Sequence, residues 1–163
     1  MCSFWRKSMY PVVRPSASPI VVASRAKVMV IEDNVDSMNL TLRILREQIG
    51  VAYCNARPSG DAFFSWLNSP QVRQNPTLSF LDLILLDIRI PRENGHIVFQ
   101  KLRALPELKR TKIVAMTANG SRDEAERARV SGFDGFIAKP ISVKNFPEQI
   151  ARVLRGEIVW DVN

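Results

Sequence analysis

The sequence alternates five times between a short apolar run and a stretch that can form a helix. The runs cover residues 27–31, 51–54, 82–86, 112–116 and 135–138, and the first of them is rich in β-branched residues. Between the first two runs, apolar side chains recur at the three- and four-residue steps of one helix face, at Met38, Leu42, Leu45 and Ile49. Parallel strands need such helical crossovers, so the alternation predicts an α/β fold. We expect a five-stranded parallel sheet with helices on both faces.

Local signals mark the ends of several of these helices. Ser121 followed by Glu124 has the spacing of a capping box, which is typical of a helix start. Gly50 and Gly132 are each placed where a helix would end. The stretch 69–78 contains two prolines and no apolar period, and we expect it to be a loop.

The composition is that of an ordinary globular domain. The 163 residues, with 46% apolar and 24% charged, are enough for one domain with its own core. No run approaches the roughly 20 apolar residues of a membrane-spanning helix, so we expect no membrane insertion. Cys2 and Cys54 are far apart and in no metal-ligand spacing, which indicates free thiols and a cytoplasmic location.

Charge and proline content divide the chain into three predicted parts. Residues 1–26 hold four basic residues, three prolines and no acidic residue, and we interpret them as a loosely ordered basic leader. A tether to an acidic surface or a targeting segment remains open, although prolines interrupt any signal-peptide core. Residues 27–156 form the predicted domain, and 157–163 a short tail. The domain lacks a basic, aromatic-interleaved patch, so direct nucleic-acid binding is not indicated.

Polar side chains follow four of the five predicted strands at the point where each strand ends. Glu32 and Asp33 follow the first strand, Asp87 the third, Thr117 the fourth and Lys139 the fifth. The carboxyl ends of parallel strands lie along one edge of a sheet, which is where open α/β sheets bind ligands. We therefore expect these five side chains to meet in one shallow site.

Three carboxylates in one site repel one another unless a cation is present. Oxygen ligands with room for water suit Mg²⁺. A carboxylate beside Mg²⁺ and an ammonium group can act as a nucleophile toward phosphorus and form an acyl phosphate. Lys139, the Thr117 hydroxyl and the metal can each stabilise an oxygen of the transferred phosphoryl group.

Four motifs in this order carry a family resemblance: "VIEDN" (30–34), "LILLDIRIPRENG" (83–95), "IVAMTANG" (113–120) and "GFIAKPI" (135–141). With these motifs and spacings, residues 26–156 resemble the receiver domain of two-component response regulators, as in the single-domain chemotaxis regulator. The resemblance implies a flavodoxin-like sheet with strand order 2-1-3-4-5.

The resemblance also implies roles for individual residues. Asp87 is similar to the phosphoacceptor, which receives a phosphoryl group from a sensor histidine kinase or a histidine phosphotransfer protein. Asp33 resembles the direct ligand of Mg²⁺ and Glu32 its partner through water. Asp87 and the backbone carbonyl of Arg89 complete the implied metal site.

A second set of residues resembles the family's phosphate-binding and switch positions. Thr117 matches the switch hydroxyl, Ala118 the neighbouring phosphate-binding position, and Lys139 the phosphate-pairing lysine. Phe136 stands where the family often has a switch aromatic, although it lacks a hydroxyl. The resemblance implies a cis peptide bond between Lys139 and Pro140. It also implies a switch that alters docking to a downstream protein, whose identity is not indicated, and leaves a homodimer open.

The sequence departs from the family pattern at a few positions. Glu32 replaces the more frequent aspartate, and Ile90 the more frequent methionine. Arg89 and Asn119 occupy variable positions, each two residues after an implied site residue. We hypothesise that these two side chains set how fast water reaches an acyl phosphate.

The leading interpretation is a stand-alone signalling receiver that is not an enzyme. A phosphatase of the haloacid dehalogenase type also uses an aspartate at a strand end, but it needs a second aspartate two residues later, where this chain has Arg89. The other alternative is a degenerate receiver that acts as an adaptor without phosphorylation. The complete set of acids, threonine and lysine argues against it.

Overall fold

The apolar runs form one parallel sheet, and it has one strand more than expected. The computed structural model describes residues 23–75 and 80–162, and within them six strands are ordered β2-β1-β3-β4-β5-β6. Every neighbouring pair is parallel. The α/β fold and the order 2-1-3-4-5 are thus confirmed. The strands are β1 (Lys27–Ile31), β2 (Tyr53–Arg57), β3 (Leu83–Asp87), β4 (Lys112–Thr117), β5 (Gly135–Ala138) and β6 (Val159–Asp161).

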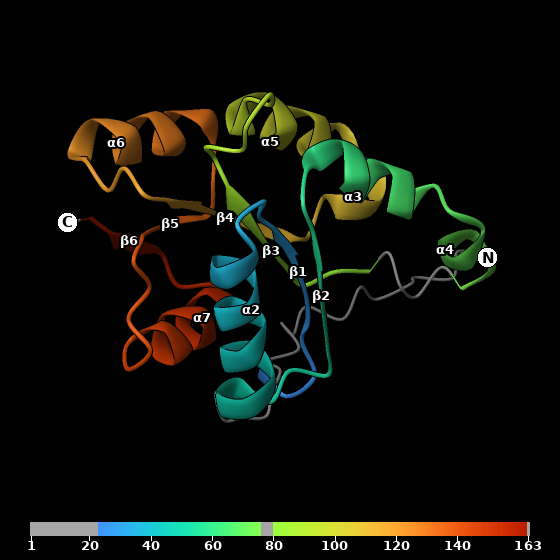
Figure 1. Ribbon diagram of the computed structural model, residues 1–163, viewed down its shortest axis with the longest axis horizontal. Helices are drawn as coiled ribbons and strands as arrows, with labels where there is room; N and C mark the ends of the chain where they lie inside the picture. Colours follow the sequence, from blue (N-terminus) through green and yellow to red (C-terminus); the bar gives the residue numbers. More distant parts are fainter. Residues whose placement is uncertain (1–22, 76–79, 163) are drawn as a thin grey trace, which may run out of the picture.

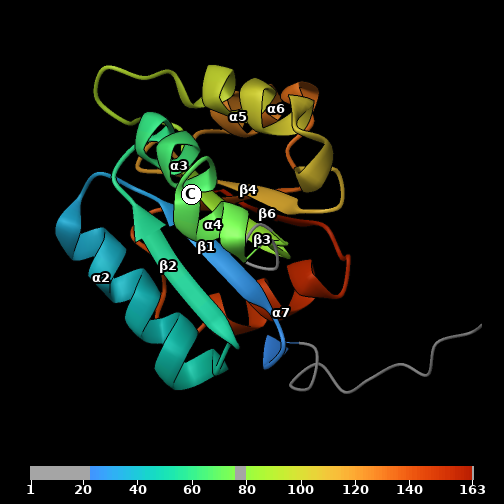
Figure 2. The same cartoon turned by 90° about the vertical axis from the view of Figure 1, so that its right-hand side faces the viewer.

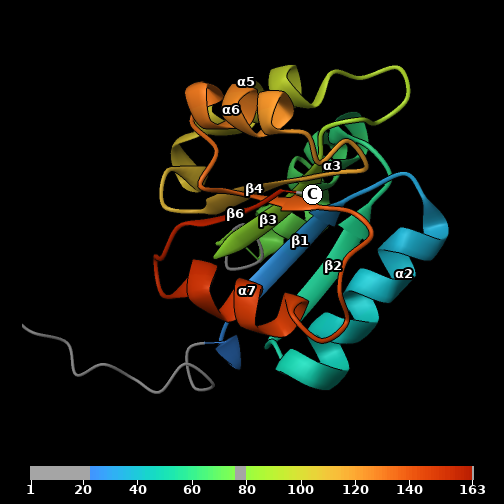
Figure 3. The same cartoon turned by 90° about the vertical axis from the view of Figure 1, so that its left-hand side faces the viewer.

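Helices cover both faces of the sheet, as Figures 1 and 3 show. One face carries α2 (Val35–Arg43), whose last turns continue as a π-helix over Ile44–Ile49, and α7 (Phe146–Leu154). The other face carries α3 (Gly60–Leu67), α5 (Gly95–Ala104) and α6 (Arg122–Ser131), which lie above the sheet in Figure 2. Two shorter helices, α4 (Pro70–Gln74) and a 3₁₀ turn at Pro106–Leu108, lie in the connections.

The central strands are buried on both faces, which explains why their sequences do not alternate with polar residues. In β3, Leu83 and Leu85 belong to the core beneath α2 and α7. Ile84 and Leu86 belong to the opposite core, beneath α3, α5 and α6. A polar residue is therefore costly anywhere in β3 except at its end, where Asp87 lies.

Several predicted boundaries differ from the structure. Strands β3 and β4 include as their last residues Asp87 and Thr117, which were expected to follow them. Strand β2 begins two residues later than predicted, at Tyr53. The expected loop at 69–78 contains α4, because the Ser69 hydroxyl accepts a hydrogen bond from the amide of Val72 and Pro70 occupies the first turn. Proline is favoured in the first helical turn, where its missing N–H has no intrahelical partner.

The sixth strand lies within the segment expected to be a short tail. Val159 is 4% exposed, and the Trp160 ring stacks on Phe136 with centroids 6.2 Å apart. Glycine at position 135 allows this approach, since a Cβ there would lie 2.9 Å from the carbonyl oxygen of Val159. Of the predicted leader, residues 23–26 are described, with Ala23 and Ala26 buried. The rest of that prediction falls outside the described residues.

Candidate functional site at the carboxyl ends of the strands

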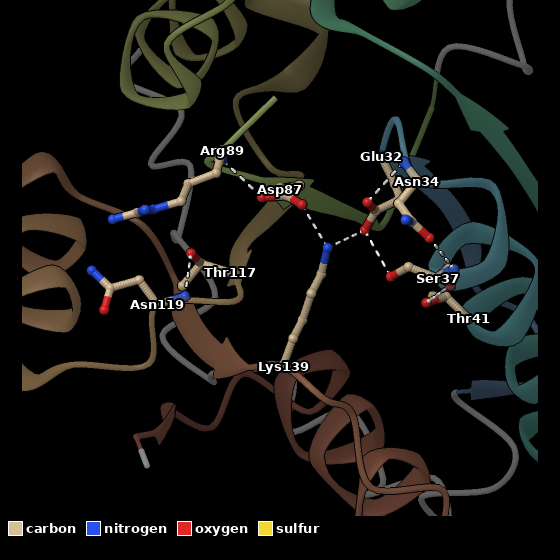
Figure 4. A network of polar contacts seen from close by, with 9 residues as sticks. All are labelled: Glu32, Asn34, Ser37, Thr41, Asp87, Arg89, Thr117, Asn119 and Lys139. Atoms are coloured by element: carbon tan, nitrogen blue, oxygen red, sulfur yellow. Dashed lines mark hydrogen bonds and ion pairs between the residues drawn. The ribbon is translucent and has the colours of Figure 1, made fainter. Parts of the chain in front are cut away.

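The polar residues that end four strands converge at one edge of the sheet. Figure 4 shows Lys139 reaching from the end of β5 between Asp87, at the end of β3, and Glu32, which follows β1. Thr117 ends β4 on the side of Asp87. The parallel register places these strand ends together, as the sequence pattern predicts.

Three carboxylates form the acidic part of the site. Oxygen atoms of Glu32, Asp33 and Asp87 all lie within 4.8 Å of one another. Glu32 is 2% exposed and Asp87 is 7% exposed, whereas Asp33 lies toward the solvent. Such close anions in a partly desolvated site favour a bound cation.

Lys139 supplies a positive charge to two of these acids. Its ammonium group pairs with Glu32 Oε2 and lies 2.5 Å from Asp87 Oδ2. Burial acts to lower the pKa of Lys139, but hydrogen bonds and charge from Asp87 and Glu32 outweigh it and raise that pKa above its ordinary value of 10.5. Lys139 is therefore charged throughout the physiological pH range.

Glu32 is held in place from the side of α2. Its Oε1 accepts a hydrogen bond from the amide of Asn34 at 3.1 Å, and its Oε2 accepts one from the Ser37 hydroxyl at 3.0 Å. Asn34 also caps α2 by accepting from the amide of Ser37. The same turn that starts the helix thus fixes the direction in which Glu32 points, a contribution of Asn34 and Ser37 that the motif alone did not predict.

The phosphoacceptor candidate and the switch candidates are positioned by backbone contacts. Asp87 Oδ1 accepts a hydrogen bond from the amide of Arg89 at 2.7 Å. The buried Thr117 hydroxyl accepts one from the amide of Asn119 at 3.1 Å. Ala118, between them, is exposed. The side chains of Arg89 and Asn119 extend to the same side of the network in Figure 4, away from Lys139.

Two further predicted features lie in β5 or directly after it. The peptide bond between Lys139 and Pro140 is cis. Phe136, the second residue of β5, is fully buried in the core beneath α6. Its neighbour on the outer side is Trp160 of β6, a contact that no local pattern in the sequence indicates.

The donor set fits a small divalent cation. Three carboxylates face one ammonium group, which leaves the cluster with excess negative charge and oxygen donors only. Hard cations such as Mg²⁺ prefer oxygen ligands and retain waters, and the accessible Asp33 leaves room for them. Asp33, Asp87 and Glu32 are the side chains that would hold the ion or its waters.

Comparison with known proteins identifies the family of this chain. Residues 28–151 match the family described as the response regulator receiver domain. This chain belongs to the response regulator receiver family. Receiver proteins similar to it include the polar-differentiation response regulators DivK of Brucella ovis and Brucella abortus (strain S19), each 34% identical over 127 residues, covering 78% of this chain and 94% of the relative.

Solved receiver structures share the fold. The chemotaxis response regulator CheY4 of Vibrio cholerae aligns with a TM-score of 0.66 at 19% identity, covering 79% of this receiver chain and 98% of CheY4. A response regulator receiver protein from Burkholderia phymatum aligns with a TM-score of 0.66 at 24% identity, covering 80% and 96% of the two chains. No helix among residues 23–75 and 80–162 is both long enough and apolar enough to cross a bilayer.

Proposed function

We propose that this receiver accepts a phosphoryl group on Asp87 from a histidine of a sensor kinase or phosphotransfer protein and signals by phosphorylation-dependent docking to another protein. The observation that carries the proposal is the Lys139 ammonium group held between Asp87 and Glu32, beside Asp33. A stand-alone role is proposed by analogy with the DivK relatives, which consist of little more than the matched receiver domain, since the match covers 94% of their length.

The chemistry assigned to the residues is a nucleophilic displacement at phosphorus. An Asp87 carboxylate oxygen attacks the phosphorus of phosphohistidine, a P–O bond forms, the P–N bond breaks, and the imidazole leaves with a proton from solvent. Mg²⁺, when bound, neutralises charge on the phosphoryl oxygens. The new phosphoryl anion attracts the Lys139 ammonium group, which then pairs with one phosphoryl oxygen. The Thr117 hydroxyl donates a hydrogen bond to another phosphoryl oxygen.

The test is the intact mass of the protein after incubation with acetyl phosphate and Mg²⁺. We expect one phosphoryl group per chain, and none when EDTA replaces Mg²⁺. A chain that stays unmodified with every phosphodonor tried, but still binds a partner, would be the degenerate adaptor instead. Steady hydrolysis of a phosphatase substrate over many turnovers would contradict the proposal that the protein is not an enzyme.

Phosphorylation should change the environment of Trp160. In the proposed switch, Thr117 moves toward the phosphoryl group and Phe136 follows, which disturbs the stacking of Trp160 on Phe136. We expect the tryptophan emission to change on phosphorylation in the wild type and to remain unchanged in Trp160→Phe. The same emission change in Trp160→Phe would assign it to Trp66 or Trp5 and contradict a role for Phe136 in the switch.

Arg89 and Asn119 should control the lifetime of the acyl phosphate. Arg89 follows Asp87 and Asn119 follows Thr117 by two residues, and both side chains extend on the same side of the polar network in Figure 4. We expect the half-lives of phosphorylated Arg89→Ala and Asn119→Ala to differ from wild type by several-fold, measured by the decay of the intact-mass signal. Half-lives equal to wild type in both variants would contradict the assignment.

The proposal extends to location and assembly. We propose a cytoplasmic location, because the sequence predicts that both cysteines, Cys2 and Cys54, are free thiols. A homodimer remains a prediction, to be tested by the mass of the phosphorylated protein in solution.

A further inference from the structure

The loop between β3 and α5 is attached to the start of α3 by one side chain. Glu93 Oε2 accepts a hydrogen bond from the amide of Gly60 at 2.7 Å, and Oε1 accepts one from the amide of Asp61 at 3.0 Å. The two segments are separated by more than 30 residues in sequence. The carboxylate therefore caps a helix that belongs to a different part of the fold.

This contact is stronger than an ordinary surface hydrogen bond. A carboxylate that accepts from two amides at a helix N-terminus gains from charge-assisted bonds and from the helix dipole. The Ser59 hydroxyl accepts from the next amide, that of Ala62, at 3.0 Å, so Glu93 and Ser59 together satisfy the first turn of α3. A Cβ at position 60 would lie 3.1 Å from Glu93 Oε2 and 2.8 Å from Val98, so glycine permits the close approach.

The loop attached in this way carries the backbone next to the phosphoacceptor candidate. Arg89, four residues before Glu93, donates its amide to Asp87 Oδ1 at 2.7 Å. The amide of Glu93 donates to the Ile90 carbonyl at 3.2 Å, which closes the turn between them. Arg92 has a φ of 66°, a left-handed conformation that is unfavourable for a residue with a side chain. Such a conformation persists where neighbouring contacts fix the backbone on both sides, and the contacts of Glu93 do so on one side.

We propose that Glu93 is a positioning residue for the metal and phosphoryl site. By holding the loop against α3, it fixes the Arg89 amide that orients Asp87 and the Arg89 carbonyl expected to face the metal. The inference rests on the proposed function, because it assumes that Asp87 and the Arg89 carbonyl bind Mg²⁺. It assigns a role to a residue outside the acidic cluster and adds α3 to the elements that support the site.

The test measures Mg²⁺ affinity, by isothermal titration calorimetry, separately from folding stability. Glu93→Ala removes both hydrogen bonds. Glu93→Gln keeps the shape but can accept from only one amide, since its NH₂ group would face the other N–H. Glu47→Gln is the control, because Glu47 is exposed on the π-helical segment after α2. Unfolding in EDTA and amide exchange at Gly60, Asp61 and Arg89 are followed for each protein.

We expect Glu93→Ala to weaken Mg²⁺ binding about tenfold, as is typical for residues that orient metal ligands. Glu93→Gln should lose less Mg²⁺ affinity, and Glu47→Gln should bind Mg²⁺ as tightly as the wild type. Exchange should accelerate at Arg89 as well as at Gly60 and Asp61 in both Glu93 variants. Faster exchange at Gly60 and Asp61 with unchanged Mg²⁺ affinity would show that Glu93 only caps α3 and would overturn the inference. If the wild type itself bound no Mg²⁺, the proposed function would be contradicted. This result is distinguishable from one that contradicts only the role of Glu93.

Discussion

Lys139→Met should unfold at markedly lower denaturant concentration than the wild type when no divalent cation is present. The substitution leaves Glu32 and Asp87, which are 2% and 7% exposed, without their cationic partner. Removing one member of a buried ion pair costs about 3–5 kcal/mol. Because this site opens to water on one side, we expect Lys139→Met to lower the free energy of unfolding by about 3 kcal/mol, the lower end of this range.

Mg²⁺ should reverse much of this loss, because the cation and the ammonium group compete for the same carboxylates. We therefore expect Lys139→Met to bind Mg²⁺ more tightly than the wild type, and its stability to rise steeply as Mg²⁺ is added. Lys144→Met, an exposed position ahead of α7, is the control and should change stability by less than about 0.5 kcal/mol. An equally small change in Lys139→Met would show that the buried acids do not depend on this lysine.

The raised pKa of Lys139 also fixes the sign of a pH effect. The stabilisation from its charge is fully present below the ordinary pKa of 10.5 and is lost as the pH rises through the higher folded-state value. The wild type should therefore lose stability in this alkaline range, and Lys139→Met should lose less. The free energies of unfolding of the wild type and Lys139→Met, measured by chemical denaturation at pH 9 and above about pH 11, test this difference.

Asp87→Asn should abolish phosphorylation while leaving the fold intact. The amide lacks the second carboxylate oxygen and is a poor nucleophile toward phosphorus. Its remaining oxygen can still accept from the Arg89 amide, and the loss of one negative charge relieves repulsion with Glu32 and Asp33. Intact mass after acetyl phosphate and Mg²⁺ should show no modified chain.

Asp82→Asn is the matched control for this variant. Asp82 directly precedes β3, at the opposite end of the strand from Asp87, and its carboxylate accepts from the Lys27 amide at 2.8 Å. Phosphorylation of Asp82→Asn should match the wild type. Persistent modification of Asp87→Asn at the wild-type rate would mean that another residue accepts the phosphoryl group.

The architecture and the acidic cluster could be predicted because they follow from short-range patterns. Parallel strands bring their carboxyl ends to one edge, so a polar residue that directly follows an apolar run, such as Asp87 or Lys139, must lie there. The same logic placed Glu32 and Asp33 beside them. Each of these predictions needs only the strand boundaries and the handedness of the crossovers.

The missed features depend on tertiary contacts. The sixth strand has three residues, and it pairs where Gly135 admits the Val159 carbonyl and Phe136 offers a surface for Trp160. The sequence around Glu93 indicates an ordinary polar loop residue. Its partner, the start of α3, comes from another part of the chain. Such pairings leave no periodic signal in the sequence.

The identity of the modified residue decides whether Asp87 is the phosphoacceptor. Borohydride reduces an acyl phosphate to an alcohol, so the phosphorylated protein can be reduced, digested and examined by peptide mass spectrometry. We predict that homoserine replaces aspartate at position 87 and at no other position, and only after incubation with both phosphodonor and Mg²⁺. Reduction at Asp33 or at Glu32, or a phosphorylated protein without any reducible acyl phosphate, would contradict the assignment of Asp87 as the phosphoacceptor.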